Sequence, residues 1–341
     1  MKTFIIAEAG VNHNGHIDIA KKLVDIAADA GADAIKFQTF KAEKIVTTTA
    51  SCANYQIKNT KRAESQFDML KKLELSIDGH KELLSYCLGK NITFMSTPFD
   101  ENSADMLNDF GMNIFKIPSG EITNMPLIKH IAKKNKSIIL STGMSYLGEI
   151  EKAINWINEE WEKINIKPQL SLLHCVSNYP AKVEDTNLLA MKTMENAFGL
   201  TVGYSDHTMG IEVPIAAVAI GAKIIEKHFT IDRKMEGPDH KASLEPYELE
   251  AMIKAIRNIE KAMGNGIKRP VKNEENIKKV ARRSLVAAKN IKAGAVVSLD
   301  DIQIKRPGEG ISPEYIEVII NRKARADIKK DSLFKWDDFL E

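Results

Sequence analysis

The chain has 341 residues, of which 44% are hydrophobic and 28% are charged, and its formal net charge at pH 7 is +2. These values are ordinary for a globular protein and exclude a disordered, collagen-like or strongly basic chain. The apolar runs are too short for a membrane helix, and the first ten residues lack a signal-peptide core, so we expect a cytoplasmic protein without membrane contact. Three cysteines without a CxxC pair argue against a disulfide framework and a structural zinc site.

Short apolar and β-branched runs alternate with amphipathic segments along most of the chain. The strand-like runs are 3–7, 34–37, 92–96, 113–117, 137–141, 169–174, 200–204 and 223–228. The helical segments are 17–30, 78–90, 102–110, 126–134, 147–161, 184–198, 211–221 and 246–263. Eight strands alternating with eight helical segments predict an α/β protein whose parallel sheet closes into a (β/α)8 TIM barrel over residues 1–265.

The pattern changes after Gly264. Residues 266–281 are polar and punctuated by glycine and proline, which predicts a linker. Residues 266–283 hold seven Lys or Arg against two Glu, and because no recognition motif accompanies them we expect a solvated face and no nucleic-acid partner. Residues 282–341 contain short strand-like pieces and predict a small β-rich domain with a marginal core of its own.

Polar residues stand at the ends of all eight predicted strands. In a TIM barrel the active site lies at the carboxyl ends of the strands, so these residues are the candidates for function. A single one of them can equally have a structural role, such as capping the next helix, but the whole set is hard to explain in that way. The set includes Glu8, Lys36, Gln38, Thr97, Lys116, Ser119, Glu121, Ser141, His174, Ser205, His207, Glu226 and His228.

Two histidines, His207 and His228, end the neighbouring seventh and eighth strands. They are either packing residues or two ligands of one divalent ion. Two imidazoles with no cysteine nearby leave positions for water and substrate oxygens, which suits Mn²⁺, Mg²⁺ or another octahedral ion better than a closed zinc site. His80 falls on a predicted helix and His16 stands at the start of another, and we expect both at the surface.

Two lysines, Lys36 and Lys116, are predicted in the crowded mouth of the barrel, where an unpaired ammonium group is costly. One of them could form a Schiff base, as in an aldolase, or both could hold a phosphate or carboxylate. Hydroxyl groups on neighbouring strands favour anion binding. The residues alone therefore predict a metal-assisted barrel enzyme that acts on an anionic substrate.

The strand-end motifs resemble the sialic acid synthase family, which includes N-acetylneuraminate, legionaminate and pseudaminate synthases. They run through nearly the whole chain in the family's order. The matching segments are 7–15 (AEAGVNHNG), 36–39 (KFQT), 96–99 (STPF), 116–121 (KIPSGE), 141–144 (STGM), 172–175 (LLHC), 203–207 (GYSDH), 226–229 (EKHF), 237–240 (GPDH) and 305–308 (KRPG).

This resemblance implies a barrel joined to a C-terminal antifreeze-like (SAF-type) domain, in a homodimer where each small domain covers the partner's barrel mouth. It also implies the reaction. C3 of phosphoenolpyruvate attacks the aldehyde of an N-acylated amino sugar, water adds to C2, and phosphate leaves by C–O cleavage, giving a nine-carbon 2-keto acid.

The resemblance also implies a role for individual residues of each matching motif. The metal ligands are His207 and His228, with Mn²⁺ favoured and Mg²⁺ or Co²⁺ as alternatives. The residues that hold phosphoenolpyruvate are Lys36, Thr97, Lys116, Ser119 and Ser205. Those around the sugar and the ion are Glu8, Gln38, Tyr179 and Asp239, while Arg306 reaches the sugar's N-acyl group from the partner. Glu8, Lys116 and Glu121 are the catalytic candidates, with Glu121 taking the proton of the attacking water.

Some positions depart from the family pattern. Ser177, counted among the substrate-binding residues, stands where some members have Asn, and Phe37 and Phe40 stand where some have His. These differences do not decide the sugar. We expect N-acetylmannosamine as acceptor and N-acetylneuraminate as product, with N,N'-diacetyllegionaminate or pseudaminate synthesis as the alternative. More distant alternatives are a Schiff-base aldolase and a carbohydrate-binding or ice-binding module on an inert barrel.

Overall fold

A computed structural model describes residues 2–52, 65–166 and 168–340 of the chain. It divides into two compact units, Met1–Gly264 and Asn265–Glu341. The strands of the first unit are β1 (Phe4–Gly10), β2 (Ala34–Thr39), β3 (Thr93–Pro98), β4 (Ile114–Ile117), β5 (Ser137–Ser141), β6 (Leu170–Cys175), β7 (Thr201–Asp206) and β8 (Ile224–His228).

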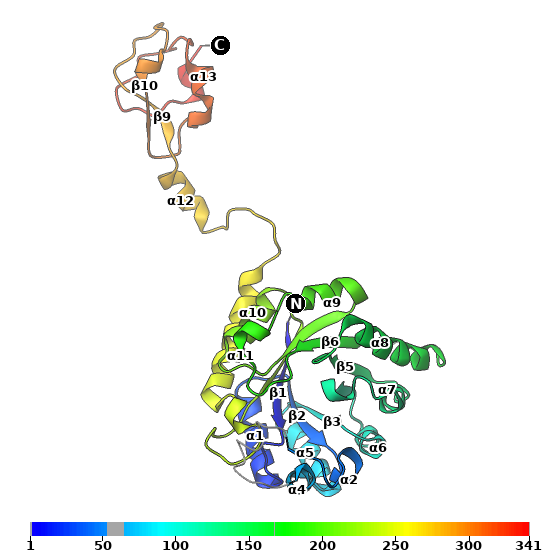
Figure 1. Ribbon diagram of the computed structural model, residues 1–341. Coiled ribbons are helices and arrows are strands. Elements are labelled where there is room, and N and C mark those ends of the chain that lie inside the picture. The colour runs from blue at the N-terminus through cyan, green and yellow to red at the C-terminus, as the bar shows by residue number, and fades with distance from the viewer. Residues whose placement is uncertain (1, 53–64, 167, 341) are drawn as a thin grey trace. The chain divides into compact units, whose positions relative to one another are not determined.

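These strands form one parallel sheet. Their hydrogen-bonded order is β3-β2-β1-β8-β7-β6-β5-β4, and β3 and β4 at the two ends of this order lie next to each other. Figure 1 shows the strands at the centre of the unit with helices around them. The predicted TIM barrel is therefore confirmed.

Helices cover the outside of the barrel (Figure 1). They are α1 (Ile17–Asp29), α2 (Ala42–Ile45), α4 (Gln66–Leu73), α5 (Ile77–Gly89), α6 (Glu101–Asp109), α7 (Met125–Ala132), α8 (Leu147–Glu162), α9 (Ala190–Phe198), α10 (Glu212–Ala219) and α11 (Pro246–Met263), with short 3₁₀ helices η1 (Ser119–Glu121), η2 (Val183–Asp185) and η3 (His240–Ala242). Helix α1 shows the reason for this arrangement, because four of its apolar residues recur at helical spacing and are fully buried: Ala20, Leu23, Val24 and Ala27.

The helix expected at 184–198 is wrong in its first half. The segment forms η2 and then the shorter α9, and Asn187 between them has a φ of +41°. A residue in this left-handed conformation cannot continue an α-helix, so the helix begins only at Ala190. His80 was also misplaced, since it is buried, with its ring nitrogens bonded to Thr39 Oγ1 and to the carbonyl oxygen of Ser76.

The interior of the barrel has an apolar layer and a polar layer. Six inward-facing residues form an apolar cluster: Ile6, Ala34, Met95, Ile139, Leu173 and Ile224. Because side chains alternate along a strand, the residues two positions later face the same way, nearer the carboxyl ends. Those residues are Glu8, Lys36, Thr97, Ser141, Cys175 and Glu226. The apolar cluster thus forms a floor under a layer of polar side chains.

The second unit has a small core of its own. Strand β9 (Ser284–Ala287) pairs with the antiparallel β10 (Ile302–Lys305), and ten buried apolar residues, among them Leu285, Phe334 and Phe339, form one cluster. Its helices are α12 (Glu274–Ala281), α13 (Ile316–Ile319), η4 (Leu299–Asp301), η5 (Pro313–Tyr315) and η6 (Trp336–Asp338). The segment expected as a linker therefore contains a helix.

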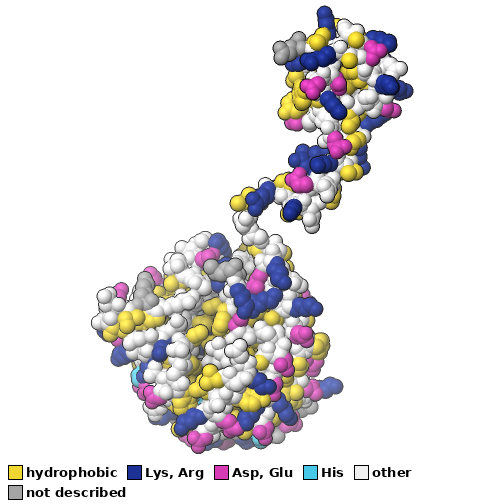
Figure 2. All heavy atoms as spheres, turned by 180° about the vertical axis from the view of Figure 1, so that it is seen from behind, with side chains coloured by type: hydrophobic (Ala, Val, Ile, Leu, Met, Phe, Trp, Pro, Cys, Tyr) yellow, Lys and Arg dark blue, Asp and Glu magenta, His cyan; other side chains and the backbone are white. Residues whose placement is uncertain are grey.

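The basic run at residues 266–283 is exposed to solvent at every position. Figure 2 shows dark blue Lys and Arg side chains along the first part of the second unit. In the described part of the chain, no helix combines the length and the apolar character needed to cross a bilayer.

Candidate active site

Four charged side chains meet in the polar layer of the barrel. Lys36 Nζ lies 2.7 Å from Glu8 Oε2 and 3.6 Å from Glu226 Oε2. Lys116 Nζ donates to Glu226 Oε1 at 3.0 Å. All four side chains are at most 5% exposed. Two ammonium groups and two carboxylates from β1, β2, β4 and β8 therefore share one buried space, which we call the charged cluster.

Hydroxyl groups from three further strands line the same layer. Lys36 Nζ donates to Thr97 Oγ1 at 2.9 Å, and Ser205 Oγ donates to Glu226 Oε1 at 2.9 Å. The buried Ser141 Oγ has no hydrogen-bond partner in the described residues. A buried hydroxyl without a partner is costly in a folded protein, so a water molecule or a ligand would complete this layer beside Ser141.

The two carboxylates of the charged cluster differ in their acidity. Burial raises the pKa of Glu8 to about 7, although Lys36 beside it opposes the shift. Burial alone would also raise the pKa of Glu226, but Lys116 and Lys36 together outweigh burial and hold it well below its usual range. Glu226 therefore stays ionised at neutral pH, whereas Glu8 can take up or give up a proton there.

The two lysines differ as well. Burial opposes the charge on Lys36, but Glu226 and Glu8 outweigh it and raise the pKa of this lysine. Burial lowers the pKa of Lys116, despite its bond to Glu226. A lowered pKa is what a Schiff-base lysine needs, but the ion pair with Glu226 favours the charged form that binds anions.

The two histidines predicted as metal ligands lie together above this layer. The ring centroids of His207 and His228 are 5.6 Å apart, and both side chains are buried. Burial lowers the pKa of both imidazoles, and for His228 the neighbouring His207 adds to the effect. His207 Nδ1–H donates to the carbonyl oxygen of Val176 at 2.6 Å, which leaves its Nε2 lone pair available.

These residues fit a divalent ion. Both rings are neutral at pH 7, as metal ligands must be, and the buried His228 Nδ1 has no hydrogen-bond partner among the described residues. No third His, Cys, Asp or Glu completes a metal-binding group in the part of the chain that the structure describes. The remaining coordination positions would therefore belong to water or to substrate oxygens, which suits Mn²⁺ or Mg²⁺ better than a closed zinc site.

Gly10 brings three candidate residues together. A Cβ at this position would lie 3.4 Å from Glu8 Oε1, 3.4 Å from His228 Cε1 and 3.6 Å from Gln38 Nε2. Gly10 also has a φ of +52°, which glycine adopts without strain. The ring of Tyr179 covers the other side, with its centroid 4.1 Å from that of His207. Glu8, Gln38 and Tyr179 thus surround the histidine pair.

A second group of small polar side chains converges on Gly143, after β5. The amide N–H of Gly143 donates to Ser119 Oγ at 2.9 Å, and Ser119 Oγ lies 3.1 Å from Cys175 Sγ. A Cβ on Gly143 would lie only 2.3 Å from Ser177 Oγ and 2.9 Å from Ser119 Oγ. The absent side chain lets these side chains approach the backbone closely, so that hydroxyl groups and a backbone N–H gather at one place. We call this group the Gly143 cradle, and such a set of small polar groups suits a phosphate.

The remaining three predicted site residues lie in other segments of the chain. Glu121 lies in η1, and its Oε2 accepts from Asn124 Nδ2 at 2.6 Å. Asp239 is buried just before η3, where burial raises its pKa to about 6. Arg306 belongs to the second unit, on an exposed segment after β10.

Sequence reasoning counted Glu226 and Ser141 among the strand-end candidates, and the segment around Ser141 and Gly143 among the donors that favour anion binding, but it did not place these three residues among the predicted site residues. A usable signal existed for Glu226, since it stands two positions before His228 on the same strand and must face the same way. Ser141 could have been placed by the same argument from Ile139. Gly143 carries no comparable signal, because only coordinates show which atoms its missing Cβ would meet.

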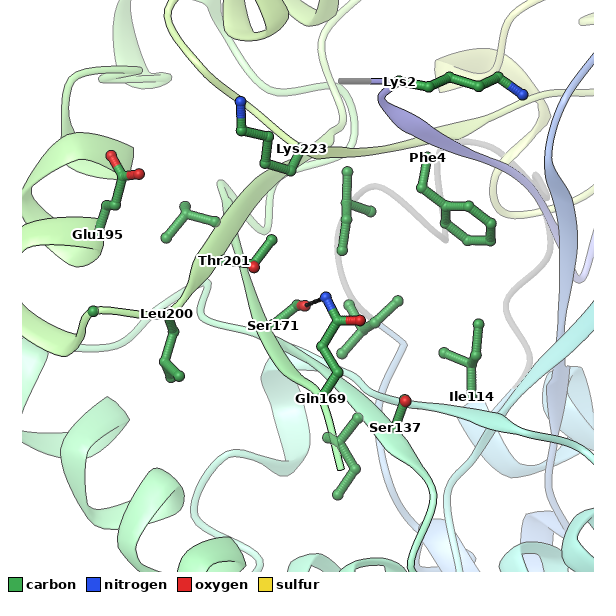
Figure 3. A pocket seen from close by; sticks show the side chains of 15 residues that line it. Lys2, Phe4, Ile114, Ser137, Gln169, Ser171, Glu195, Leu200, Thr201 and Lys223 are labelled. Atoms are coloured by element: carbon green, nitrogen blue, oxygen red, sulfur yellow. Dashed lines mark hydrogen bonds between the residues drawn. The ribbon is translucent and has the colours of Figure 1, made fainter. Parts of the chain in front are cut away.

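A separate cavity of about 710 Å³ opens at the other end of the barrel. It is lined by the first residues of several strands, among them Phe4, Ile114 and Thr201, and Figure 3 shows Lys2 and Lys223 beside the starts of β1 and β8. None of the predicted site residues is among its described lining. The cavity is therefore distinct from the polar layer at the carboxyl ends.

Comparisons with known proteins point to one family. The NeuB family model matches residues 23–268, and the SAF domain model matches residues 282–340. The chain is 53% identical over 334 residues to the N,N'-diacetyllegionaminic acid synthase of Campylobacter jejuni, covering 98% of this chain and 99% of that protein. It is 45% identical over 337 residues to the protein of the same name from Legionella pneumophila, covering 99% and 94%.

A solved structure shows the same architecture. The N-acetylneuraminic acid (sialic acid) synthetase of Leptospira borgpetersenii, crystallised with citrate, is 38% identical to this chain. The match covers 81% of this chain and 90% of that one, with a TM-score of 0.71.

Proposed function

Because this chain is an enzyme of the NeuB family with a C-terminal SAF domain, we propose that it condenses phosphoenolpyruvate with an N-acylated amino-sugar aldehyde. The products are a nine-carbon 2-keto acid and inorganic phosphate. The observation that supports this most directly is the buried polar layer. It combines two lysines, several hydroxyl groups and the Gly143 cradle below a pair of neutral imidazoles.

The phosphate and the carboxylate of phosphoenolpyruvate would bind to the charged cluster and the Gly143 cradle. Lys36 and Lys116 supply the cations, and hydroxyl groups such as Ser119 and Thr97 supply neutral donors. With Glu8 protonated, the cluster carries two positive charges and one negative charge, so it attracts the anion. Once phosphate departs, the same fixed cations stabilise its charge without reorganisation.

A carboxyl group with a pKa near 7 suits the proton transfers of this reaction. Glu8, protonated when the anion binds, can give its proton to the aldehyde oxygen as the C–C bond forms. The resulting carboxylate can then accept the proton that water loses as it adds to C2, since its pKa is near 7. Glu121 was the expected acceptor, but its carboxylate bonds to Asn124 outside the charged cluster. We therefore assign the proton transfer to Glu8 and leave Glu121 as the alternative.

We assign a divalent ion to His207 and His228, with Mn²⁺ favoured over Mg²⁺ or Co²⁺. Such an ion supplies Lewis acidity toward the aldehyde oxygen of the sugar. The protein's part is to hold both imidazoles neutral and, through the bond from His207 Nδ1 to Val176, to fix which nitrogen faces the ion.

The acceptor we propose is the six-carbon aldose with two N-acetyl groups, which gives N,N'-diacetyllegionaminate. Two proteins of that name are 53% and 45% identical to this chain, whereas the N-acetylneuraminic acid synthetase is 38% identical. This reverses the order expected from the sequence, in which N-acetylmannosamine came first. Pseudaminate synthesis uses the same chemistry and stays an alternative.

An acceptor panel tests this proposal. The purified protein with Mn²⁺ should release phosphate from phosphoenolpyruvate fastest with the di-N-acetylated aldose and more slowly with N-acetylmannosamine. Phosphoenolpyruvate labelled with ¹⁸O in the bridging oxygen should deliver the label to phosphate, because the C–O bond breaks. If no N-acyl sugar supports release, the assignment fails.

The Schiff-base aldolase makes opposite predictions. Borohydride reduction with a keto-acid substrate would label Lys36 or Lys116, and EDTA would leave activity intact. The proposed reaction gives no borohydride adduct and requires the ion.

We also propose a homodimer in which Arg306 contacts the sugar's N-acyl group in the partner's barrel. Arg306→Ala should then abolish turnover without unfolding the barrel. Mixing it with His207→Ala should restore partial activity, because one site in the heterodimer keeps both residues. No restoration in proven heterodimers would exclude shared sites.

A further inference from the structure

A buried ion pair lies on the outer side of the barrel, directly behind the two histidines. Asp206 and Lys227 are paired in register on β7 and β8, and each immediately precedes one of His207 and His228. Neighbouring residues of a strand point to opposite faces, so this pair faces the helices while Glu226 and His228 face the interior. Both side chains of the pair have 0% exposure.

The pair fixes the backbone on both sides of His207. Lys227 Nζ donates to Asp206 Oδ2 and to the carbonyl oxygen of Thr208, each at 2.5 Å. Asp206 Oδ1 accepts from the amide N–H of Thr208 at 3.0 Å and from Thr208 Oγ1 at 2.9 Å. Residues 206 and 208 are thus joined to each other and to β8. We call Asp206, Thr208 and Lys227 the outer clamp.

Two hydrogen bonds hold His207 itself, in addition to those of the outer clamp. Its carbonyl oxygen accepts from the amide N–H of Ala181 at 2.9 Å, and its Nδ1–H donates to Val176 at 2.6 Å. With the backbone held by the outer clamp and the ring held by Val176, the imidazole has one orientation relative to His228.

Stability alone does not explain the outer clamp. Taking two charges out of water costs several kcal/mol for each ion, and replacing a buried pair by apolar residues of similar size is often neutral or stabilising. Apolar residues, however, cannot bond to both the N–H and the C=O of Thr208. We therefore consider that the outer clamp orients the backbone next to His207.

We propose that Asp206 and Lys227 are positioning residues that set the orientation of His207 for a divalent ion. The inference rests on the proposed metal site at His207 and His228. It concerns the strength of metal binding by the free protein, so it can be tested without turnover.

The main test is the double variant Asp206→Leu/Lys227→Met, which removes the clamp without leaving a buried unpaired charge. Mn²⁺ binding to the free protein is measured by electron paramagnetic resonance, together with circular dichroism and the melting temperature. We expect the Kd for Mn²⁺ to rise about 10- to 100-fold, the usual effect of removing groups that orient metal ligands. A folded double variant with a Kd within twofold of wild type would overturn the inference.

Lys223→Met is the matched control. Lys223 precedes β8 at the opposite end, where its exposed side chain lies beside the cavity in Figure 3. The same substitution there should leave the Kd for Mn²⁺ unchanged. An equal loss in both variants would overturn the inference, since it would report a general weakening of β8.

Thr208→Val serves if the double variant does not fold. It keeps the volume and the backbone bonds but removes the hydroxyl bond to Asp206, so the Kd should rise a few-fold. An unchanged Kd there would count against the clamp.

His207→Ala separates this inference from the proposed metal site. If wild type does not bind Mn²⁺, or if His207→Ala binds it equally well, both the proposed metal site and the proposed role of the outer clamp are wrong. If His207→Ala abolishes binding while the double variant binds like wild type, only the clamp fails.

Discussion

Replacing Glu8 by Gln should stabilise the barrel at pH 8, whereas the same change at Glu226 should destabilise it. Burial raises the pKa of Glu8 from 4.5 to about 7, so between these values the folded protein holds a proton that the unfolded chain releases. Stability from this group therefore falls as pH rises through that window. At about 1.4 kcal/mol per pKa unit, the loss above pH 7 is about 3 kcal/mol, and Gln does not incur it.

The contribution of Glu226 to folding stability changes with pH in the opposite direction. Burial opposes its charge, but Lys116 and Lys36 hold its pKa below the usual range. Its contribution to stability is therefore present above the unfolded value of 4.5 and is lost as pH falls toward the folded value. Glu226→Gln leaves both ammonium groups without their shared anion, and removing one member of such a buried network costs about 3–5 kcal/mol at neutral pH.

Urea denaturation at pH 5 and pH 8, in EDTA so that bound ions do not shift either pKa, measures both effects. The free energy of unfolding of Glu8→Gln minus that of wild type should rise by about 2–3 kcal/mol from pH 5 to pH 8. Other titrating groups cancel in this difference. A flat difference, or the same sign for both variants at pH 8, would refute the assignment of charges in the cluster.

Three further predictions follow from other contacts. Gly143→Ala should raise the KM for phosphoenolpyruvate at least about tenfold and lower the free energy of unfolding by about 1–3 kcal/mol, because its Cβ would lie 2.3 Å from Ser177 Oγ. EDTA should abolish phosphate release, and Mn²⁺ should restore it. In the second unit, the Lys289 ammonium group lowers the pKa of Asp301 to about 2, so its stabilisation is present above pH 3.8 and is lost as pH falls toward 2. Asp301→Asn should therefore speed hydrogen exchange of residues 284–339 at pH 5, reflecting a loss of about 1–2 kcal/mol, and a variant no different from wild type would contradict this.

Periodicity located the barrel elements well. The strand Ser137–Ser141 and the helix Pro246–Met263 were predicted at their observed bounds, because their apolar residues repeat cleanly and turn residues flank them. The carboxyl ends of β1, β3 and β7 were predicted two or three residues too early. Their last residues, such as Glu8 and Thr97, look like loop residues by polarity, yet they are buried strand residues because they line the polar layer.

The candidate site could be predicted only in part. The rule that barrel active sites lie at the carboxyl strand ends identified Lys36 and Lys116, and the structure brings them to one carboxylate, Glu226. Which carboxylate is shared depends on inter-strand register, which the sequence does not provide. Glu121 illustrates the reverse case, since its three-residue spacing to Asn124 permits a local bond that only coordinates reveal.

Anomalous diffraction at the manganese edge, from crystals grown with Mn²⁺ and phosphoenolpyruvate, tests the central claim most directly. We predict one strong peak bonded to both His207 and His228, with the phosphoenolpyruvate phosphate and carboxylate on Lys36, Lys116 and the Gly143 cradle. A peak that involves neither imidazole, or phosphoenolpyruvate bound away from those lysines, would contradict the account.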